Sequence, residues 1–310
     1  MSEPQNLPGD FLSTEPTAPK RYFIAGAPFD APSLAPGLYV VATPIGNLRD
    51  ITLRALETLA AADVVFCEDT RTSARLLDHY GIKTPRKPLH EHNERERAGA
   101  IVEDLGRGAA IALISDAGTP LLSDPGFPLV RAAREAGAAV FAVPGASALL
   151  SGLSIAGLPT DRFSFIGFLP VKTVARQKAI AGLKDRPETL VFYESPRRLG
   201  DALAALADGF GGEREAAVAL ELTKRFERVS RGKLAALAAE YGAAETKGEA
   251  VILVAGGAAP EAPSTEDWQA ALAEALADQP LRAAVDATAE RFGVKRKQVY
   301  DAALALKAQE

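Results

Sequence analysis

Short apolar runs alternate with amphipathic stretches from Leu38 onward, and this alternation constrains the fold more than any other feature of the chain. The apolar runs have the length and β-branched content of strands. The first four lie at 38–42, 63–67, 110–115 and 139–143. The stretches between them have the spacing of amphipathic helices, and strands that alternate with helices form crossover units around a mainly parallel sheet. The sequence therefore predicts an N-terminal α/β domain over residues 37–145.

A second α/β domain is predicted over residues 146–257, where the order of the elements changes. Two strands, 163–168 and 189–194, are separated by a basic amphipathic stretch at 172–184. Three close-spaced apolar runs follow, at 215–223, 226–232 and 249–256. Strands this close together leave no room for crossover helices, so we expect a mixed sheet in this domain.

Two proline-rich segments bound these domains. Residues 1–36 have no sustained helical or strand period, which predicts a disordered leader. A second break opens the segment 258–310, whose remainder is purely helical. Two short helices, a turn at Gly293 and a third helix that opens with basic residues resemble a helix-turn-helix unit. Two roles stay open for this tail: contact with RNA, or three-helix packing that serves as a dimer element.

Composition excludes several classes of protein. With 310 residues, 47% of them hydrophobic, the chain can bury a core and is not disordered as a whole. Its net charge of −5 excludes a globally basic nucleic-acid binder, so any RNA binding requires a local patch. A single cysteine excludes an intramolecular disulfide. No apolar run reaches the length of a membrane span and no signal peptide is present, which predicts a cytoplasmic protein.

Three loops that follow strands of the first domain are rich in small residues. They are ATPIGNLRD at 42–50, SDAGTPLLSDPGFP at 115–128 and VPGASALLSGL at 143–153. Glycines allow the backbone to approach a ligand closely, and the third loop presents free amides at a helix N-terminus. Loops at the carboxyl edge of a parallel sheet form ligand sites, so we expect a composite pocket for an adenosine-sized ligand. The chain has neither a dinucleotide fingerprint nor a P-loop.

Two polar clusters at strand ends offer groups for acid–base chemistry or phosphate contact. One holds Glu68, Asp69 and Arg71, and the other holds His90, His92, Asn93 and Glu94. Structural roles compete with the catalytic one. They are an ion pair of Glu68 with Arg71, a helix N-cap at Thr70, and a capping box of Asn93 with Glu96.

A metal site is a further alternative for the second cluster. His90 and His92, at strand spacing, would share one face of a strand and could bind a metal ion. The chain has three histidines and one cysteine, which disfavours such a site. We therefore expect no metal.

Seven strings of these loops and clusters occur in a fixed order along the chain. They are ATPIGNLRDITLRALETL, EDTRTSARLL, LHEHNE, SDAGTPLLSDPG, VPGASALLSGLSIAGLPTDRFSFIGFLP, FYESPRR and ELTKRFE. The series resembles the ribosomal RNA small-subunit methyltransferase I family, within the tetrapyrrole-methylase-like superfamily. The resemblance covers residues 38–256 and extends to the helical tail, whereas the leader lies outside it.

This resemblance implies the two-domain α/β fold of the class III methyltransferases, with S-adenosylmethionine (SAM) in the cleft between the domains. It also implies a homodimer that methylates a cytidine ribose 2′-hydroxyl in the decoding centre of 16S rRNA within the small ribosomal subunit. Its motifs place the cofactor contacts on loops of the first domain and strand ends of the second. These contacts are Thr43, Pro44, Ile45, Asp116, Thr119, Ser147, Ala148, Tyr193, Leu220, Glu249 and Ala250.

The implied reaction assigns roles to the remaining polar residues. SAM carries its own leaving group, so the protein has to align a ribose oxygen with the methyl group and accept its proton, without a metal. A ribose hydroxyl is a poor nucleophile at neutral pH, so a carboxylate or imidazole is expected nearby. The candidates, in no assigned order, are Glu68, Asp69, His92 and Glu94. The residues expected to contact the substrate are Asn47, Arg71, Lys295, Arg296 and Lys297.

Two other functions remain open, because one fold can serve several activities. The first is methylation of a tetrapyrrole carbon or of a modified side chain of a translation factor. The second is RNA binding that responds to SAM without catalysis, through Arg71 and the basic residues of 172–184. The strings GNLRD, EDTRT and HEHNE and the basic start of the last helix favour RNA methylation over both.

Overall fold

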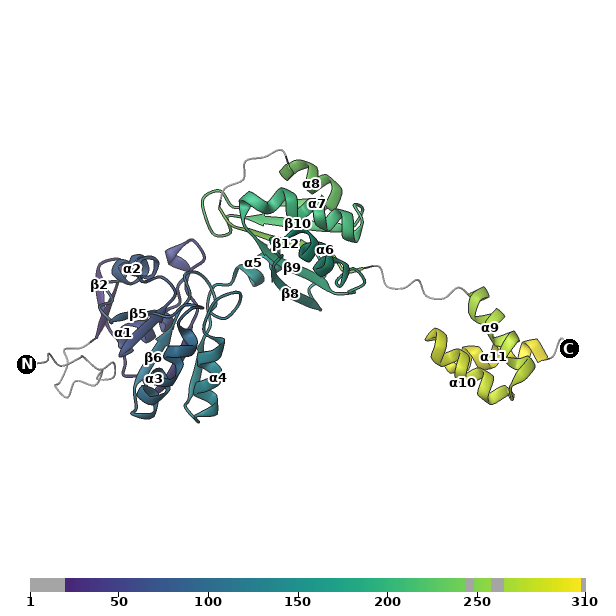
Figure 1. Ribbon diagram of the computed structural model, residues 1–310, viewed down its shortest axis with the longest axis horizontal. Coiled ribbons are helices and arrows are strands. Elements are labelled where there is room, and N and C mark those ends of the chain that lie inside the picture. The colour runs from purple at the N-terminus through teal and green to yellow at the C-terminus, as the bar shows by residue number, and fades with distance from the viewer. Residues whose placement is uncertain (1–19, 243–247, 258–264, 308–310) are drawn as a thin grey trace, which may run out of the picture. The chain divides into compact units, whose positions relative to one another are not determined.

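The computed structural model describes residues 20–242, 248–257 and 265–307 (Figure 1). The chain divides into two compact units, and the larger one ends at Ala255, with only residues 185–187 assigned to the smaller one. The larger unit holds two five-stranded sheets and a two-stranded hairpin. The smaller unit, from Gly256 onward, holds the last three helices. No helix in these described residues is long and apolar enough to cross a membrane.

The first sheet is parallel throughout its strand pairs, which agrees with the predicted mainly parallel sheet. Its strands, in spatial order, are β5 (Arg86–Pro88), β4 (Val64–Cys67), β6 (Ala110–Leu113), β3 (Gly37–Val41) and β7 (Val140–Val143). Four helices connect them: α1 (Leu53–Ala61), α2 (Thr70–His79), α3 (Glu94–Gly106) and α4 (Phe127–Glu135).

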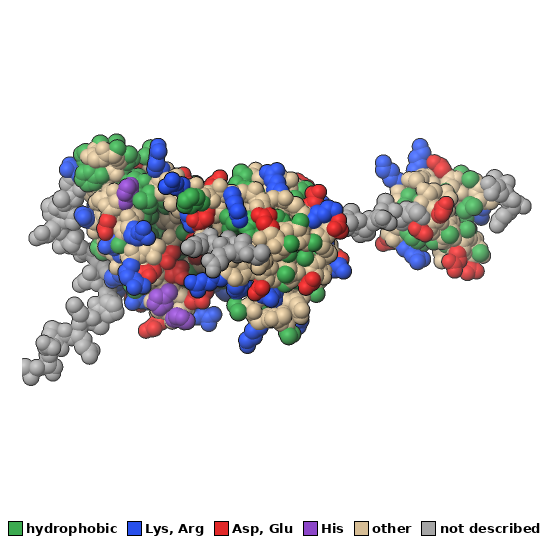
Figure 2. All heavy atoms as spheres, turned by 90° about the horizontal axis from the view of Figure 1, so that it is seen from above, with side chains coloured by type: hydrophobic (Ala, Val, Ile, Leu, Met, Phe, Trp, Pro, Cys, Tyr) green, Lys and Arg blue, Asp and Glu red, His purple; other side chains and the backbone are tan. Residues whose placement is uncertain are grey.

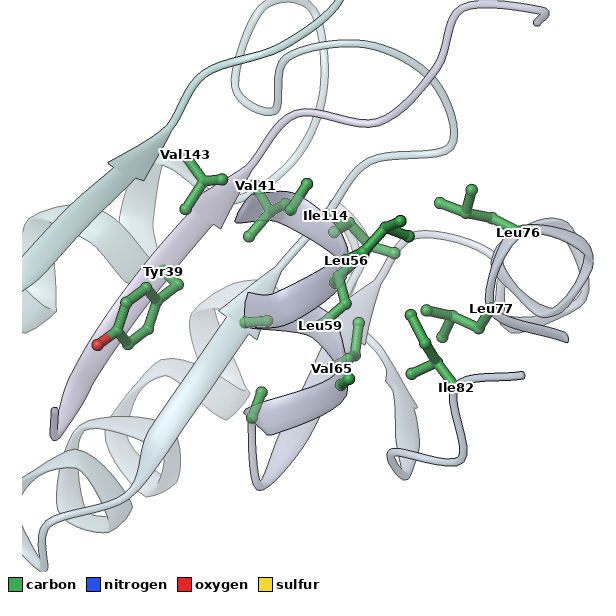
Figure 3. Close-up of a cluster of buried hydrophobic side chains, with 14 of the residues drawn as sticks. Tyr39, Val41, Leu56, Leu59, Val65, Leu76, Leu77, Ile82, Ile114 and Val143 are labelled. Atoms are coloured by element: carbon green, nitrogen blue, oxygen red, sulfur yellow. The ribbon is translucent and has the colours of Figure 1, made fainter. Parts of the chain in front are cut away.

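Side chains of β3 show why this strand is apolar throughout. Tyr39 and Val41 belong to the core cluster that α1 and α2 complete, and Leu38 belongs to the cluster that α3 and α4 complete. Successive side chains of a strand point to opposite faces, so a sheet with helices on both faces needs apolar residues at consecutive positions. Figure 3 shows the first of these clusters, to which β3 contributes Tyr39 and Val41 and α1 contributes Leu56 and Leu59.

A hairpin occupies part of the segment predicted to be a disordered leader, so that prediction is wrong for these residues. Strands β1 (Arg21–Ile24) and β2 (Ala27–Asp30) pair antiparallel across a two-residue turn in which both residues have positive φ. Such a turn matches the twist of the strands that it joins. Tyr22 is buried in the first core cluster, and the Phe23 N–H donates to the carbonyl oxygen of Tyr80 at 2.8 Å. Residues 1–19 of the predicted leader lie outside the described residues.

The second sheet is mixed, as predicted. Its strands, in spatial order, are β11 (Arg228–Lys233), β10 (Glu215–Leu220), β12 (Ala250–Val254), β9 (Thr189–Glu194) and β8 (Phe163–Phe168). Only β8 and β9 pair in parallel among these strands. The helices of this part are α5 (Ala148–Ile155), α6 (Thr173–Ala181), α7 (Leu199–Phe210) and α8 (Leu234–Gly242), of which α8 was not predicted.

The smaller unit is a three-helix packing with its own core. Its helices are α9 (Thr265–Asp278), α10 (Leu281–Phe292) and α11 (Arg296–Lys307). Trp268, Leu272, Val285 and Val299 are buried against one another. Gly293 ends α10 in the left-handed conformation, which is the predicted glycine turn.

Candidate active site

Three loops meet at one edge of the first sheet, as the sequence predicted. They follow β6, β3 and β7, which are neighbours and run parallel, so their carboxyl ends point the same way. Main-chain hydrogen bonds join the first two loops in both directions, from the Thr43 N–H to the Gly118 oxygen at 2.8 Å and back at 3.0 Å. The Thr119 hydroxyl donates to the carbonyl oxygen of Ala146 at 3.2 Å, which ties the second loop to the third.

A cavity of about 340 Å³ lies at these loops within the larger unit. This volume falls in the range of small-molecule sites. Residues that follow strands of the first sheet line it, together with residues of the second sheet and its loops. From the first part of the chain they are Ile45, Asp116, Ala117, Gly118, Thr119, Leu122, Ser123, Asp124 and Ala148, and from the second Phe168, Tyr193, Glu194, Ser195, Pro196, Leu222, Gly248, Glu249, Ala250 and Val251.

Most of the predicted cofactor contacts lie in this cavity. Seven of the eleven line it: Ile45, Asp116, Thr119, Ala148, Tyr193, Glu249 and Ala250. The other four, Thr43, Pro44, Ser147 and Leu220, are buried and do not line it. The buried residues have structural tasks, since Thr43 pairs with Gly118 and the Ser147 hydroxyl caps α5 by accepting from the Leu150 N–H at 3.5 Å.

Two aromatic residues of the second sheet, Phe168 and Tyr193, line the cavity. The Tyr193 ring has edge contacts with Phe165 and Phe168, at centroid distances of 4.8 and 5.9 Å. The Tyr193 hydroxyl accepts a hydrogen bond from the Leu149 N–H at 3.0 Å, so this side chain also fixes the start of α5. Phe168 is 54% exposed, which leaves an apolar ring available at the cavity.

The second loop holds its shape at a conformational cost. Leu121 and Ser123 have φ values of 72° and 70°, in the left-handed region that side chains other than glycine rarely adopt. Strain of this kind gathers at functional sites because surrounding contacts can hold it there. One such contact is the carboxylate of Glu94, which accepts from the Gly126 N–H at 2.7 Å and thereby ties the loop to the start of α3.

Comparisons with known proteins show which family the chain resembles. Residues 37–238 match the family model of tetrapyrrole (corrin/porphyrin) methylases, and residues 262–307 match that of an RsmI C-terminal HTH domain. A protein of Mesorhizobium japonicum named ribosomal RNA small subunit methyltransferase I is 50% identical over 88% of this chain and 93% of its own length. The chain belongs to the ribosomal RNA small subunit methyltransferase I family.

A second relative supports the family assignment, and a solved structure shows the fold. The methyltransferase of the same name from Pseudomonas aeruginosa is 49% identical over 86% of this chain and 96% of its own length. Among solved structures, a uroporphyrin-III C-methyltransferase of Thermus thermophilus in complex with S-adenosylhomocysteine superposes with a TM-score of 0.50. It covers 71% of this chain and 97% of its own at 20% identity, which shows a shared fold.

None of the four predicted acid–base residues of this family member lines the cavity. Asp69 is the N-cap of α2 and accepts from the Arg71 N–H at 2.8 Å. Its carboxylate also pairs with the Arg71 guanidinium at 2.9 Å, and these bonds lower the pKa of Asp69. Glu94 is the loop tie described above, and His92 is exposed. The carboxylates of Asp69 and Glu94 therefore act as acceptors for backbone N–H groups.

Glu68 is in a different environment. Burial, then the neighbouring charges of Asp116 and Glu91, raise the pKa of the Glu68 carboxyl. Asp116 itself accepts a hydrogen bond from the Asp69 N–H at 3.0 Å. The polar segment at 68–94, which holds the four acid–base candidates, thus adjoins the cavity through Asp116, although the candidates themselves do not line it.

The structural roles proposed for the polar clusters need three corrections. Arg71 pairs with Asp69 instead of Glu68, and Asp69 instead of Thr70 is the N-cap, because the helix begins one residue earlier than that role requires. Asn93 precedes α3 but makes no side-chain cap bond. Its amide oxygen accepts from the His90 N–H at 2.9 Å and its amide nitrogen lies 3.1 Å from the His90 ring, so no capping box with Glu96 forms.

The two histidines considered for a metal lie close together. Their ring centroids are 5.9 Å apart, at His90 and His92. No group of three or more potential metal-binding side chains gathers anywhere in residues 20–242, 248–257 and 265–307.

The predicted substrate residues lie in separate places. Asn47 accepts from the Arg49 N–H at 3.1 Å and caps the short helix η1 (Leu48–Asp50), beside the first loop. The Arg71 side chain is 90% exposed beyond its pairing with Asp69. The basic residues of the tail are in the smaller unit, where Lys295 precedes α11 and Arg296 pairs with Asp286.

Asp124 is a cavity residue that the sequence analysis did not single out. It is half-buried, and burial raises the pKa of its carboxyl to about 6, with further contributions from Glu68 and Asp116. A hydrogen bond with the Ser115 hydroxyl opposes this rise. The signal was present in the sequence, because the string SDPG repeats the Ser-Asp pair of SDAG within the same loop. An Asp before Pro-Gly is typical of a turn, so the local sequence predicts a turn residue and does not indicate that Asp124 lines the cavity.

Proposed function

We propose that this protein is a SAM-dependent methyltransferase that methylates the ribose 2′-hydroxyl of a cytidine in the decoding centre of 16S rRNA. The observation that carries the proposal is the cavity, which is lined by seven of the residues expected to hold SAM, from the two parts of the chain that build the two sheets. Relatives named ribosomal RNA small subunit methyltransferase I, similar over most of their length, support the choice of substrate.

The lining of the cavity suits SAM chemically. SAM combines an adenosine with a sulfonium and an ammonium group, both of which are cationic, and with one carboxylate, so its net charge is positive. The cavity offers apolar and aromatic surface at Ile45, Phe168 and Tyr193, together with carboxylates at Asp116, Asp124 and Glu249. Carboxylates favour a nearby cation, and an apolar wall favours the adenine ring.

The chain's own residues would then bind and orient both substrates. SAM, when bound, supplies an electrophilic methyl group together with its leaving group. The tied loops 42–50, 115–128 and 143–153 hold the cavity in one shape, which lowers the entropic cost of aligning a nucleotide with that methyl group. Asn47 and Arg71, beside the same sheet edge, are the proposed contacts to the RNA.

The proposed RNA contact relies on local features. Figure 2 shows Lys and Arg side chains interspersed with Asp and Glu over the visible face, and the net charge of the chain is −5. We propose Lys295, Arg296 and Lys297 as further phosphate contacts, since helix N-termini also favour phosphate. If they serve this purpose, RNA affinity should fall steeply with salt, and removal of residues 261–310 should weaken that dependence.

The family name favours rRNA over a tetrapyrrole. The solved uroporphyrin-III methyltransferase shares only the fold with this chain, at 20% identity. Residues 262–307 match a domain named after the rRNA enzyme, which supports an RNA substrate. We also propose a homodimer, which light scattering of the full chain would test.

Methyl transfer from radiolabelled SAM tests the proposal. The acceptors are small ribosomal subunits that lack the modification, naked 16S rRNA, and a tetrapyrrole precursor. We expect label in 2′-O-methylcytidine after digestion of the subunit RNA. Label in the tetrapyrrole alone would overturn the proposed substrate, and SAM binding without transfer to any acceptor would favour a SAM-responsive RNA-binding protein.

A further inference from the structure

We propose that Asp124 accepts the proton of the substrate hydroxyl during methyl transfer. This inference rests on the proposed function, because it assigns a role within that reaction. It replaces the four acid–base candidates from the sequence, none of which lines the cavity.

The position of Asp124 is fixed by its loop. Ser123 before it has a positive φ, and Pro125 after it restricts the backbone further. The next residue, Gly126, donates its N–H to Glu94 at 2.7 Å. A Cβ atom at Gly126 would lie 2.8 Å from Leu113, so the loop packs directly against the end of β6. The carboxylate is therefore held at the cavity by constrained backbone on both sides.

The other carboxylates of the cavity lining are already engaged. Asp116 accepts from the Asp69 N–H. Glu194 is 3% exposed and bonds to the Arg198 guanidinium at 3.0 Å and to the Ser195 N–H at 2.8 Å. Glu249 pairs with Lys224 at 3.2 Å. Asp124 differs from the last two because, in the described part of the chain, no cationic side chain forms an ion pair with it.

The surroundings of Asp124 suit a proton acceptor at neutral pH. The groups that act on it are the carboxylates of Glu68 and Asp116 and the hydroxyl of Ser115. Burial raises the pKa of the neighbouring Tyr193, and Asp124 adds to that rise. Burial and the two carboxylates bring the pKa of Asp124 to about 6. A general base is most effective when its pKa is near the working pH, since it is then largely ionised and still basic.

The proposed step balances in atoms and charge. The ribose oxygen forms a bond to the methyl carbon while the bond from that carbon to the sulfur breaks, and the sulfur keeps the electron pair as a neutral thioether. The hydroxyl proton moves to a carboxylate oxygen of Asp124. The cationic cofactor and the anionic carboxylate thus become neutral together, and the proton later passes to water.

Glu68 has an indirect role in this arrangement. It does not line the cavity, but its charge raises the pKa of Asp124. We therefore assign it as a positioning residue that tunes Asp124, and its removal should lower the pKa of Asp124 without removing the base.

The test compares Asp124→Asn with Glu68→Gln in the full-length protein. Single-turnover methyl transfer to unmodified small subunits is measured from pH 5 to 9, and SAM affinity is measured separately by calorimetry. For the wild type, the single-turnover rate at subsaturating SAM should rise with an apparent pKa near 6, as expected for the free protein. At saturating SAM, the rising limb of the pH–rate profile should move to lower pH because the sulfonium favours the charged carboxylate.

Asp124→Asn should lower the rate at saturating SAM by roughly 100- to 10,000-fold and remove the rising limb. It should weaken SAM binding only by the factor that corresponds to the shift of the limb between the free and the SAM-bound protein, because the coupling between the carboxylate charge and SAM is reciprocal. Glu68→Gln should keep most of the rate and shift the limb to lower pH. An Asp124→Asn protein with an unchanged rate would overturn the proposal while leaving the proposed function intact. A large loss of SAM affinity with an unchanged maximal rate would instead make Asp124 a cofactor contact. A wild type that labels no ribose would overturn both.

Discussion

The loop at 115–128 and the polar segment at 68–94 both carry carboxylates near the same edge of the first sheet, but they use them differently. In the polar segment, Asp69 and Glu94 accept hydrogen bonds from backbone N–H groups at the start of α2 and in the neighbouring loop. In the loop, Asp124 lines the cavity without a cationic partner among the described residues. The polar segment thus supports the site, and the loop supplies its reactive surface.

The largest effect that we expect from this contrast concerns SAM binding at the loop 115–128. Asp116→Ala should weaken SAM binding by roughly 10- to 150-fold, since hydrogen bonds to charged groups contribute about 1.5–3 kcal/mol. Calorimetric titration with SAM measures the change. Asp201→Ala, at an exposed position of α7, is the control and should bind SAM normally. Equal affinities of both variants would remove Asp116 from the cofactor site.

The next largest effect concerns the hydrogen bond that joins the polar segment to the loop at 115–128. Glu94→Ala removes the acceptor of the Gly126 N–H and should lower the free energy of unfolding by about 1–3 kcal/mol. Denaturant titration of the full chain measures the loss. Glu94→Gln keeps an acceptor at this position and should recover much of the stability and the methyl transfer. If Glu94→Gln were as inactive as Glu94→Ala, a proton-transfer role for Glu94 would have to be reconsidered.

A smaller effect is expected at Asp69. Asp69→Ala removes the N-cap of α2, which typically costs about 1 kcal/mol, and should change the turnover of the folded protein by less than about threefold. Asp69→Ser is the matched control, because serine is also a good N-cap. A loss of turnover of two orders of magnitude in both variants would restore Asp69 to the catalytic candidates.

The smallest effect is a pH dependence of stability at Asp124. The pKa of this carboxyl is about 6 in the folded protein and higher than its ordinary value, so its stabilising contribution is complete at low pH and is lost as pH rises through 6. Asp124→Asn should therefore be more stable than the wild type at pH 8, with the difference disappearing near pH 4. Solvent screening of a half-buried group keeps the difference small. Melting temperatures of both proteins at the two pH values measure it, and a wild type that is the more stable at pH 8 would contradict the raised pKa.

The sequence predicted the elements of the site well where the signal was local. Proline and glycine mark the loops after β3, β6 and β7, and apolar runs mark the strands whose parallel order brings those loops together. Seven of the predicted cofactor residues line the cavity for this reason. The second sheet was predicted as mixed because its last strands are closely spaced in the sequence, and only α8 escaped the pattern.

Prediction was weaker where a residue's role depends on distant partners. In the sequence, residues 21–30 belong to the predicted proline-rich leader. The hairpin that they form is held by Tyr22 in the core and by the hydrogen bond from the Phe23 N–H to the Tyr80 oxygen. Thr70 and Asn93 were assigned caps from spacing alone, whereas the structure places the α2 cap on Asp69 and bonds Asn93 to His90. Such choices between neighbouring polar groups are decided by differences of about 1 kcal/mol.

By itself, the sequence determined the α/β class, the order of the two sheets, the three loops and the family of this protein. These features follow from periodicity, turn chemistry and ordered motifs, which are all properties of short segments. Only the tertiary structure decided which carboxylate is left to react. The pKa of Asp124 depends on burial and on Glu68, 56 positions away along the chain, because electrostatic interactions act through space and not along the sequence.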